Sequence, residues 1–289
     1  MTTDTQQPTV AILTALPLEY EAVKALLSDV EEIDHPDGTY ADVGRIPGLP
    51  WRIALVRTGV GTLNAATATM RVDNWLRPQA AFFVGIAGGL KDDLELGAVV
   101  VASKVYGIHG GKLEDGRFQV RPEAWPVSYR LDQAAHKALG TTVEFKPIAV
   151  GDVVLADHES ELAAFLRTNY GDAVAFEMEG TGFAHAAHVS DKLNAMIIRG
   201  VSDKADGGKA AAEQGGWQER AAANAAAAAI AVLGKLKPVD EGQARDERRT
   251  AVADAKNRYG GDHIELKGTF HAPVIGKMVD NRGGNEPVR

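Results

Sequence analysis

The chain has 289 residues, with 39 acidic side chains, 31 basic ones and no cysteine. That length allows one large domain or two small ones and is enough to bury a substantial core. The lack of cysteine excludes a disulfide framework, a thiolate nucleophile and a Cys-ligated metal site. The formal charge of −8 argues against a surface that neutralises nucleic-acid phosphates, so no nucleic-acid partner is expected.

Neither a membrane-spanning nor a secretory segment is predicted from the hydropathy of the chain. No apolar run reaches the roughly 18 residues that a membrane-spanning helix needs, so we expect no membrane partner. The N-terminal residues 1–9 lack the basic and apolar regions of a signal peptide. The expected location is therefore the cytoplasm.

The predicted elements alternate along the chain between strands and helices. Short apolar runs predict strands at 10–15, 51–56, 80–84, 98–103, 147–155, 173–177 and 195–199. Apolar residues at helical spacing predict helices at 19–27, 64–76, 131–139, 159–169, 180–189 and 217–236. Residues 107–125 contain several glycines and scattered charges, and we expect them to form loops.

The strands read as continuous apolar runs, which is typical of a parallel sheet covered by helices on both faces. The predicted fold class is therefore α/β, a three-layer α/β/α domain with a mostly parallel central sheet and a small C-terminal tail. Composition shifts at Pro238, where a charged stretch follows an alanine-rich helix. We predict a main domain over residues 1–237, and a charged linker helix with a short β-rich tail over 238–289. Such a tail buries little by itself, so it is expected to pack on the main domain, another copy or a protein partner.

Carboxylates follow three of the predicted strands. Glu19 follows the first strand, and Asp203 follows the last. Glu177 and Glu179 follow the strand before it. Ligands of open α/β sheets bind beyond the carboxyl ends of the strands, where these side chains would meet. Together with the glycine-rich segment 85–89, they predict a site for a polar, hydroxylated substrate.

Each feature also has a simpler structural interpretation. A glutamate near a helix start, as at Glu19, can be a capping partner, and the Ser202-Asp203 pair can cap a helix. His185 and His188 lie three positions apart on a predicted helix, but without a third ligand nearby in sequence packing explains them better than a metal ion does.

The combination of motifs resembles the nucleoside phosphorylase/nucleosidase superfamily. FEMEG at 176–180 is followed along the chain by IRGVSD at 198–203, and GIAGGL at 85–90 precedes both. The opening TALPLE at 14–19 is similar to the start of the methylthioadenosine/S-adenosylhomocysteine nucleosidase branch. The resemblance covers about residues 8–237 in the right order.

The resemblance implies roles for the residues of these motifs. Asp203 would be the general acid that protonates the departing purine, and Glu19 would orient or deprotonate the attacking water. Glu179 would accept hydrogen bonds from the ribose 2′- and 3′-hydroxyls, and Met178 would pack against the sugar. Cleavage through an oxocarbenium-like state needs these functions and no metal or organic cofactor.

The resemblance also implies a surrounding set of binding residues. Arg199 would support the turn at Ser202, and Val154 and Leu155 would form part of the base pocket. The other residues placed at the site by the motifs are Glu177, Ile86 and Gly88. A homodimer is implied as well, because these domains often complete the pocket with a neighbouring subunit.

Two alternatives to a nucleosidase stay open. A phosphorylase needs an anion pocket, typically with arginines, whereas the turn at 15–19 brings a carboxylate and no basic residue. Hydrolysis of a purine nucleoside, with adenine as the expected base, is therefore favoured, and Arg57 keeps phosphorolysis open. The appended tail suits a non-catalytic nucleoside-sensing or effector module in signalling or defence. Ile86 and Val154 depart from the usual polar and aromatic residues, which leaves the exact nucleoside open.

Overall fold

The computed structural model describes residues 7–190, 193–206 and 208–239. From residue 240 on, the predicted linker helix and β-rich tail lie outside the described residues. The strands are β1 (Thr9–Thr14), β2 (Ser28–His35), β3 (Thr39–Arg45), β4 (Arg52–Arg57), β5 (Ala80–Gly89), β6 (Val99–Gly107), β7 (Gly111–Glu114), β8 (Arg117–Val120), β9 (Glu123–Pro126), β10 (Glu144–Val150), β11 (Ala175–Glu177) and β12 (Asn194–Asp203). The helices are α1 (Pro17–Lys24), α2 (Thr62–Leu76), α3 (Tyr129–Leu139), α4 (Glu161–Asn169), α5 (Gly180–Val189), α6 (Lys209–Gln214) and α7 (Trp217–Leu233).

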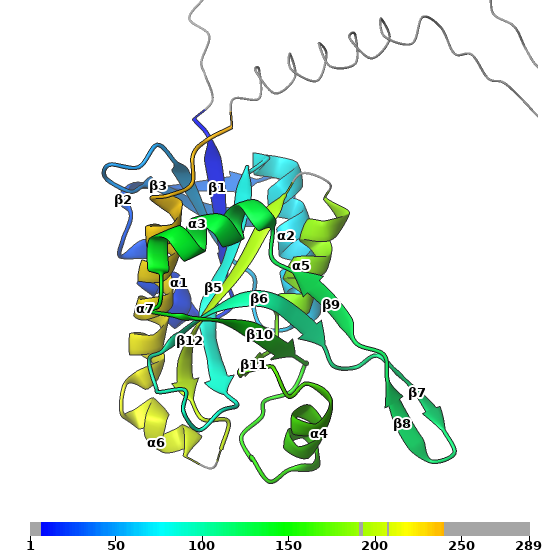
Figure 1. The fold of residues 1–289 in the computed structure, drawn as a ribbon. Coiled ribbons are helices and arrows are strands. Elements are labelled where there is room, and N and C mark those ends of the chain that lie inside the picture. The colour runs from blue at the N-terminus through cyan, green and yellow to red at the C-terminus, as the bar shows by residue number, and fades with distance from the viewer. Residues whose placement is uncertain (1–6, 191–192, 207, 240–289) are drawn as a thin grey trace, which may run out of the picture. The chain divides into compact units, whose positions relative to one another are not determined.

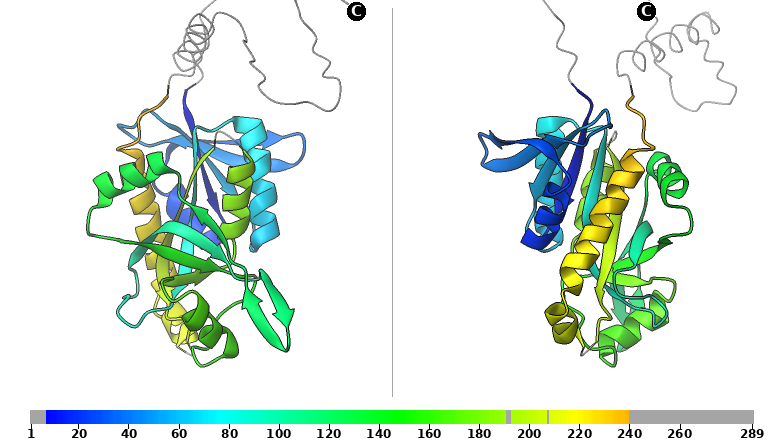
Figure 2. Two further views of the ribbon diagram at one scale, coloured as in Figure 1. Left: turned by 45° about the vertical axis from the view of Figure 1, so that its right-hand side comes forward. Right: turned by 90° about the vertical axis from the view of Figure 1, so that its left-hand side faces the viewer.

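Helices cover both faces of one large sheet (Figures 1 and 2). On one face α2 and α5 pack side by side, with Ala65 and Phe183 in a buried cluster. On the other face α1, α3 and α7 bury Val23, Leu131 and Ala225. The predicted three-layer α/β/α class is confirmed. Among the described helices, none is both long enough and apolar enough to cross a membrane.

The sheet has the order β11-β10-β6-β12-β5-β1-β4-β3-β2. Its central pairs β12–β5, β5–β1 and β1–β4 are parallel, as predicted. β1 has a parallel neighbour on each side, and it is buried along its whole length because helices cover both faces of the sheet there. β11 pairs with β10 and also, antiparallel, with the end of β5, so that β5, β12, β6, β10 and β11 close into a ring. This closure brings the segment after β11 against the carboxyl end of β5.

The alanine-rich helix α7 lies directly against β12. A Cβ atom on Gly200 of β12 would stand 2.0 Å from the carbonyl oxygen of Ala221. Glycine on the strand and alanines on the helix therefore allow a close approach of the two backbones. The helix ends at Leu233, three residues before the predicted end, where Gly234 follows.

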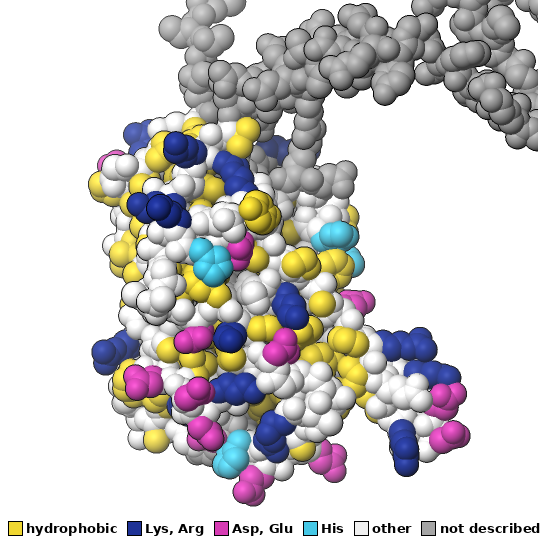
Figure 3. All heavy atoms as spheres, viewed as in Figure 1, with side chains coloured by type: hydrophobic (Ala, Val, Ile, Leu, Met, Phe, Trp, Pro, Cys, Tyr) yellow, Lys and Arg dark blue, Asp and Glu magenta, His cyan; other side chains and the backbone are white. Residues whose placement is uncertain are grey.

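The structure corrects several predicted elements. The expected loop at 107–125 contains β7, β8 and β9, and the β7–β8 hairpin projects from the body with basic and acidic side chains on its surface (Figures 1 and 3). The strand predicted at 80–84 continues to Gly89, because the glycine-rich segment 85–89 pairs with β11 and β12. The strand predicted at 147–155 ends at Val150. Residues 28–45 form the unpredicted antiparallel strands β2 and β3, whose side chains are largely polar and give no apolar run.

Candidate active site

A cavity of about 250 Å³ lies at the carboxyl ends of β1, β5, β11 and β12. Because parallel strands deliver their following residues to the same edge of a sheet, segments far apart in sequence meet here. The lining contains every predicted site residue except Arg199, namely Glu19, Ile86, Gly88, Val154, Leu155, Glu177, Met178, Glu179, Ser202 and Asp203.

Glu19 lies in the first turn of α1, and its carboxylate is buried beside the start of that helix. Oε2 accepts hydrogen bonds from the backbone N–H groups of Ala15, at 2.8 Å, and Leu16, at 2.9 Å. Oε1 accepts one from Ile86 N at 2.8 Å, which ties α1 to β5. The capping interpretation is confirmed, and the same side chain also lines the cavity. Burial raises the pKa of Glu19, and the nearby Arg199 charge partly offsets this rise.

Arg199 is fully buried among three carboxylates beneath the cavity. Its Nη2 donates to Glu177 and, at 3.4 Å, to Glu179, while Nη1 stands 3.9 Å from Glu19 Oε1. The resemblance implied support of the turn at Ser202, whereas the guanidinium instead links the carboxylates of α1, β11 and the start of α5. Within the part of the chain that the structure describes, its Nε and Nη1 have no hydrogen-bond partner.

This charge cluster depends on glycine at position 85. A Cβ atom there would stand 2.1 Å from Arg199 Nη1 and 2.4 Å from Glu19 Oε1. Any side chain at this point of β5 would therefore push the guanidinium and the carboxylate apart. The sequence predicted Gly85 only as part of a glycine-rich segment at the site, whereas the structure shows that the missing side chain leaves room for Arg199 and Glu19.

The two glutamates of the FEMEG motif have different surroundings. Glu177 Oε1 accepts from Gly180 N at 2.8 Å, and Oε2 accepts from Glu179 N at 3.0 Å and from Arg199. Its carboxylate is thus engaged in capping α5 and in the ion pair, although it borders the cavity. Glu179 Oε1 accepts from Gly61 N at 2.9 Å, at the start of α2. Burial and the neighbouring Glu177 charge raise the pKa of Glu179 to about 7, despite the opposing effect of Arg199.

Asp203 ends β12 and lies opposite Gly88 of β5. The register of the two strands shifts between Val201 and Asp203, a local irregularity of the kind that re-aims side chains next to active sites. Asp203 Oδ1 accepts from Ala205 N at 2.9 Å, and Ser202 Oγ lies 2.9 Å from Oδ2. Asp203 as a whole residue is 4% exposed, and it lines the cavity.

One wall of the cavity is aliphatic. Val153 and Val154 follow the end of β10 and are 41% and 57% exposed, whereas Leu155 behind them is buried. Val60, from the turn before α2, lines the same cavity, and Met178 is half-buried beside it. The wall therefore offers an apolar surface next to the carboxylates.

Several lining residues were missed by sequence reasoning. Gln218 comes from the first turn of α7, Val60 from the turn before α2, and Ala205 from the segment after β12. No local pattern marks them, because they reach the cavity through the packing of whole elements. Ala205 carries the one usable signal, since it lies two residues after Asp203 of the Ser-Asp pair.

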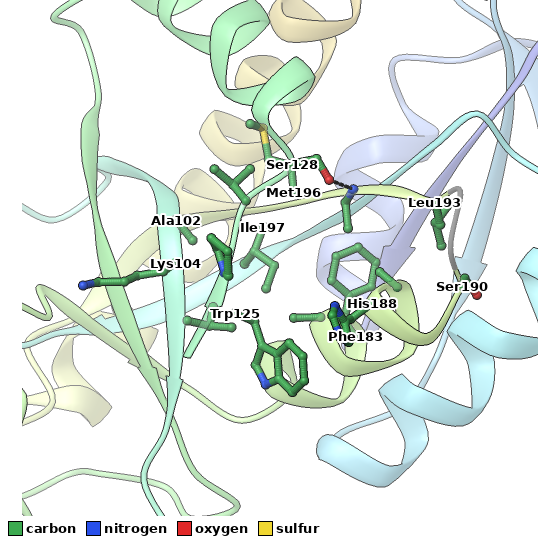
Figure 4. Close-up of a pocket in the computed structure, with 16 residues that line it drawn as sticks. Ala102, Lys104, Trp125, Ser128, Phe183, His188, Ser190, Leu193, Met196 and Ile197 are labelled. Carbon is green, nitrogen blue, oxygen red and sulfur yellow. Dashed lines mark hydrogen bonds between the residues drawn. The ribbon is translucent and has the colours of Figure 1, made fainter. Parts of the chain in front are cut away.

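A second cavity, of about 390 Å³, lies between β6, β9, β12 and α5 (Figure 4). Trp125 lies on its lower side in that view, and its ring packs 4.9 Å from the ring of His188 and 5.2 Å from that of His185. The packing interpretation of the two histidines is confirmed. In the described ranges, no group of three or more His, Asp or Glu side chains is placed to hold a metal ion.

Comparison with known proteins agrees with this geometry. The sequence model of the phosphorylase superfamily matches residues 9–234, which is most of the chain. The chain belongs to the phosphorylase superfamily. The match spans every element that lines the carboxylate cavity.

Three relatives illustrate where the chain lies in this superfamily. It is 26% identical over 240 residues to a 5′-methylthioadenosine/S-adenosylhomocysteine nucleosidase of Desulfotalea psychrophila, covering 79% of this chain and 98% of the relative. The structure also matches a crystal structure of the 5′-methylthioadenosine/S-adenosylhomocysteine nucleosidase from Neisseria meningitidis in complex with methylthio-immucillin-A. The TM-score is 0.70 and the sequences are 27% identical, and the match covers 79% of this chain and 99% of that one. The chain is also 27% identical over 241 residues to the ATP nucleosidase Cap17 of Escherichia coli, covering 70% of this chain and 47% of Cap17, so it spans about half of that relative.

Proposed function

We propose that the protein hydrolyses the N-glycosidic bond of a purine nucleoside and releases the free base. The observation that carries this proposal is the convergence of Glu19, Glu179 and Asp203, from three separate parts of the chain, on one cavity. Cleavage of the bond through an oxocarbenium-like state needs a proton for the leaving base, a placed water and a fixed sugar. The relatives named as nucleosidases support the same reaction.

Asp203 is the proposed general acid. Its carboxyl group borders the cavity beside Gly88 and Ala205, and the missing side chain at residue 88 lets Asp203 approach β5 closely, since a Cβ there would stand 3.0 Å from Oδ1. As the C–N bond breaks, its electron pair passes to the purine and a proton from Asp203 neutralises it. Ser202 Oγ and Ala205 N hold the carboxyl group in place during this transfer.

Glu19 is proposed to place the water, with Arg199 behind it. Glu19 lines the cavity and can accept a hydrogen bond from the water, while Arg199 Nη1, 3.9 Å from Glu19 Oε1 and outside the lining, stabilises the negative charge of that carboxylate. The water then attacks the anomeric carbon and loses a proton to Glu19. Because its pKa is raised, Glu19 accepts a proton more readily than an exposed glutamate does.

Glu179 is proposed to hold the ribose hydroxyls. One of its oxygens accepts from Gly61 N and the other from Arg199, and an ionised carboxylate has further lone pairs for two hydroxyl donors. Met178 and Val60 line the cavity next to it and supply an apolar surface for the sugar. Val154 and Leu155 would flank the base.

Water is proposed as the nucleophile rather than phosphate. Neither Lys, Arg nor His occurs among the described residues that line the cavity, and its walls carry four carboxylates instead. The buried Arg199 is already shared among Glu19, Glu177 and Glu179. A phosphate dianion would therefore meet repulsion without a free cation to bind it.

Adenine is the proposed base, and two classes of substrate follow from the relatives. The similarity to the nucleosidases of Desulfotalea psychrophila and Neisseria meningitidis makes methylthioadenosine and S-adenosylhomocysteine the first candidate substrates of this protein. The similarity to Cap17 favours ATP as a second candidate. We also propose a homodimer, as the superfamily resemblance implies, which light scattering of the purified protein would test.

The test is chromatographic quantification of free base. The purified protein is incubated with methylthioadenosine, S-adenosylhomocysteine, adenosine, inosine and ATP, each with and without phosphate. Release without phosphate is expected, and the preferred compound identifies the substrate. Release that requires phosphate would overturn hydrolysis. Binding of a nucleoside, seen as a rise in melting temperature without release, would support the non-catalytic module instead.

A further inference from the structure

The turn at Gly61 and Thr62, which starts helix α2, is bonded to the site from two directions. Gly61 N donates to Glu179 Oε1 at 2.9 Å, and Thr62 Oγ1 donates to the carbonyl oxygen of Met178 at 3.1 Å. The position of the turn therefore sets one of the hydrogen bonds that the buried carboxylate of Glu179 receives.

A residue from another part of the chain fixes this turn. Thr62 N donates to Oδ1 of Asp152 at 3.0 Å, across 90 positions of sequence. Gly61, the N-cap residue of α2, makes no side-chain cap bond, and the Asp152 carboxylate stands in for one. A negative charge is also favourable at a helix N-terminus. Asp152 itself is held by its backbone N–H, which donates to Nε2 of His109 at 3.2 Å.

Asp152 thus connects two sides of the cavity. It directly precedes Val153, Val154 and Leu155, which form the aliphatic wall, and its carboxylate holds the turn that contacts Glu179. The residue does not itself line the cavity. Asp152 therefore acts on the site through the turn at Gly61 and Thr62, and not by contact with a bound ligand.

We propose that Asp152 is a positioning residue, which caps α2 so that Gly61 donates to the ribose-binding carboxylate of Glu179. The assignment rests on the proposed function of Glu179. It goes beyond capping alone, because loss of the cap would release the Gly61 bond and change the site as well as the helix.

The consequence is a defined effect on protonation of Glu179. The groups that face this carboxylate are Glu177 from β11, Arg199 from β12, Glu19 from α1 and the N–H of Gly61. The Gly61 bond stabilises the ionised form and so lowers the pKa of Glu179, against the effect of burial. Weakening that bond favours the protonated form, which has fewer lone pairs for the ribose hydroxyls.

The test compares Asp152→Ala with two other variants of the full chain. Asp152→Asn keeps an acceptor oxygen for Thr62 N, and Ser160→Ala removes a different N-cap bond, the one that Ser160 Oγ accepts from Ala163 N in α4. For Asp152→Ala we expect kcat/KM at pH 7 to fall about tenfold and the midpoint of its pH profile to move upward. Asp152→Asn is expected to restore most of both. Ser160→Ala is expected to lower the melting temperature and leave the pH profile unchanged.

A second measurement does not depend on turnover. Carbon-13 NMR of glutamate-labelled protein follows the Glu179 carboxyl signal, which is assigned by its loss in Glu179→Gln. Its titration midpoint is expected to be higher in Asp152→Ala than in the wild type. An unchanged midpoint, or an Asp152→Ala variant that matches Ser160→Ala in every readout, would overturn the positioning role. Because the titration needs no substrate, it decides this point even if the wild type releases no base.

Discussion

The carboxylate cavity and the cavity beside Trp125 differ in chemistry more than in size. The first, of about 250 Å³, is bordered by four carboxylates that come from α1, from the FEMEG segment and from the end of β12. The second, of about 390 Å³, is walled largely by Trp125, Phe183, Met196 and other apolar side chains (Figure 4). No Asp or Glu side chain is among the described residues that line the larger cavity.

The comparison shows that buried carboxylates, which are unfavourable unless they are compensated, identify a candidate site better than the volume of a cavity does. Burying a carboxylate is unfavourable unless hydrogen bonds or an opposite charge offset the loss of water. Around the first cavity, Arg199 and six backbone N–H groups donate to Glu19, Glu177 and Glu179. The N–H groups are those of Ala15, Leu16, Gly61, Ile86, Glu179 and Gly180. The described residues that line the second cavity include no carboxylate, so no comparable arrangement is needed there.

The largest effect that would test this contrast is expected from Asp203→Asn. The amide cannot supply the proton to the leaving base, so release of base should fall about 10³-fold. Affinity for the nucleoside, measured by calorimetry, should stay within a few-fold of the wild type because the cavity keeps its shape. Unchanged turnover would remove Asp203 as the acid.

Gly85→Ala should follow in size. The added Cβ would collide with Arg199 Nη1 and Glu19 Oε1, at 2.1 Å and 2.4 Å, and would break the buried ion cluster. We expect a loss of unfolding free energy of about 3 kcal/mol together with a large loss of base release. Gly107→Ala is the matched control, since its nearest neighbour would be a Thr181 methyl carbon at 3.3 Å. Equal behaviour of the two variants would contradict the role of Gly85.

A smaller but distinctive effect is expected from the pH dependence of turnover. Since the pKa of Glu179 is about 7, acidification below that value protonates the carboxylate that is proposed to bind the ribose. kcat/KM should therefore fall as the pH decreases through about 7, and Glu179→Gln should lower it at all pH values. If kcat/KM of the wild type stayed constant from about one pH unit below to about one pH unit above the pKa of Glu179, this assignment would be contradicted.

Stability should depend on the same group with a definite sign. The folded protein holds a proton on Glu179 up to pH about 7, whereas the ordinary value of 4.5 applies to the unfolded chain. The contribution of this group to the unfolding free energy is therefore greatest below pH 4.5 and decreases as the pH rises to about 7. Relative to the wild type, Glu179→Gln should gain roughly 3 kcal/mol of unfolding free energy as the pH rises between those limits. Denaturant titrations at several pH values would measure it, and a constant difference would contradict it.

The smallest effect is expected at the Trp125 cavity. His188→Ala removes a ring that packs on Trp125 and should lower the melting temperature by a few degrees. Base release should stay within about twofold, because His188 takes no part in the carboxylate cavity. A large loss of activity with an unchanged melting temperature would show that the second cavity takes part in function.

The sequence by itself determined the main layers of the fold and the types of residue at the candidate site. Continuous apolar runs such as residues 10–15 predicted buried parallel strands, because strands covered on both faces lack polar alternation. Polar residues that directly follow such strands predicted a shared edge, which is where Glu19 and Asp203 lie. These signals are local in the chain, so a single sequence contains them.

Tertiary structure alone decided how the carboxylates are held. The three-residue strand β11 pairs antiparallel with the end of β5, and this pairing places Glu177 and Glu179 over Arg199. The need for glycine at position 85 and the cap that Asp152 provides for α2 arise in the same way. Such contacts join residues that are distant in the chain and depend on atomic distances between packed elements, which no periodicity in the sequence encodes.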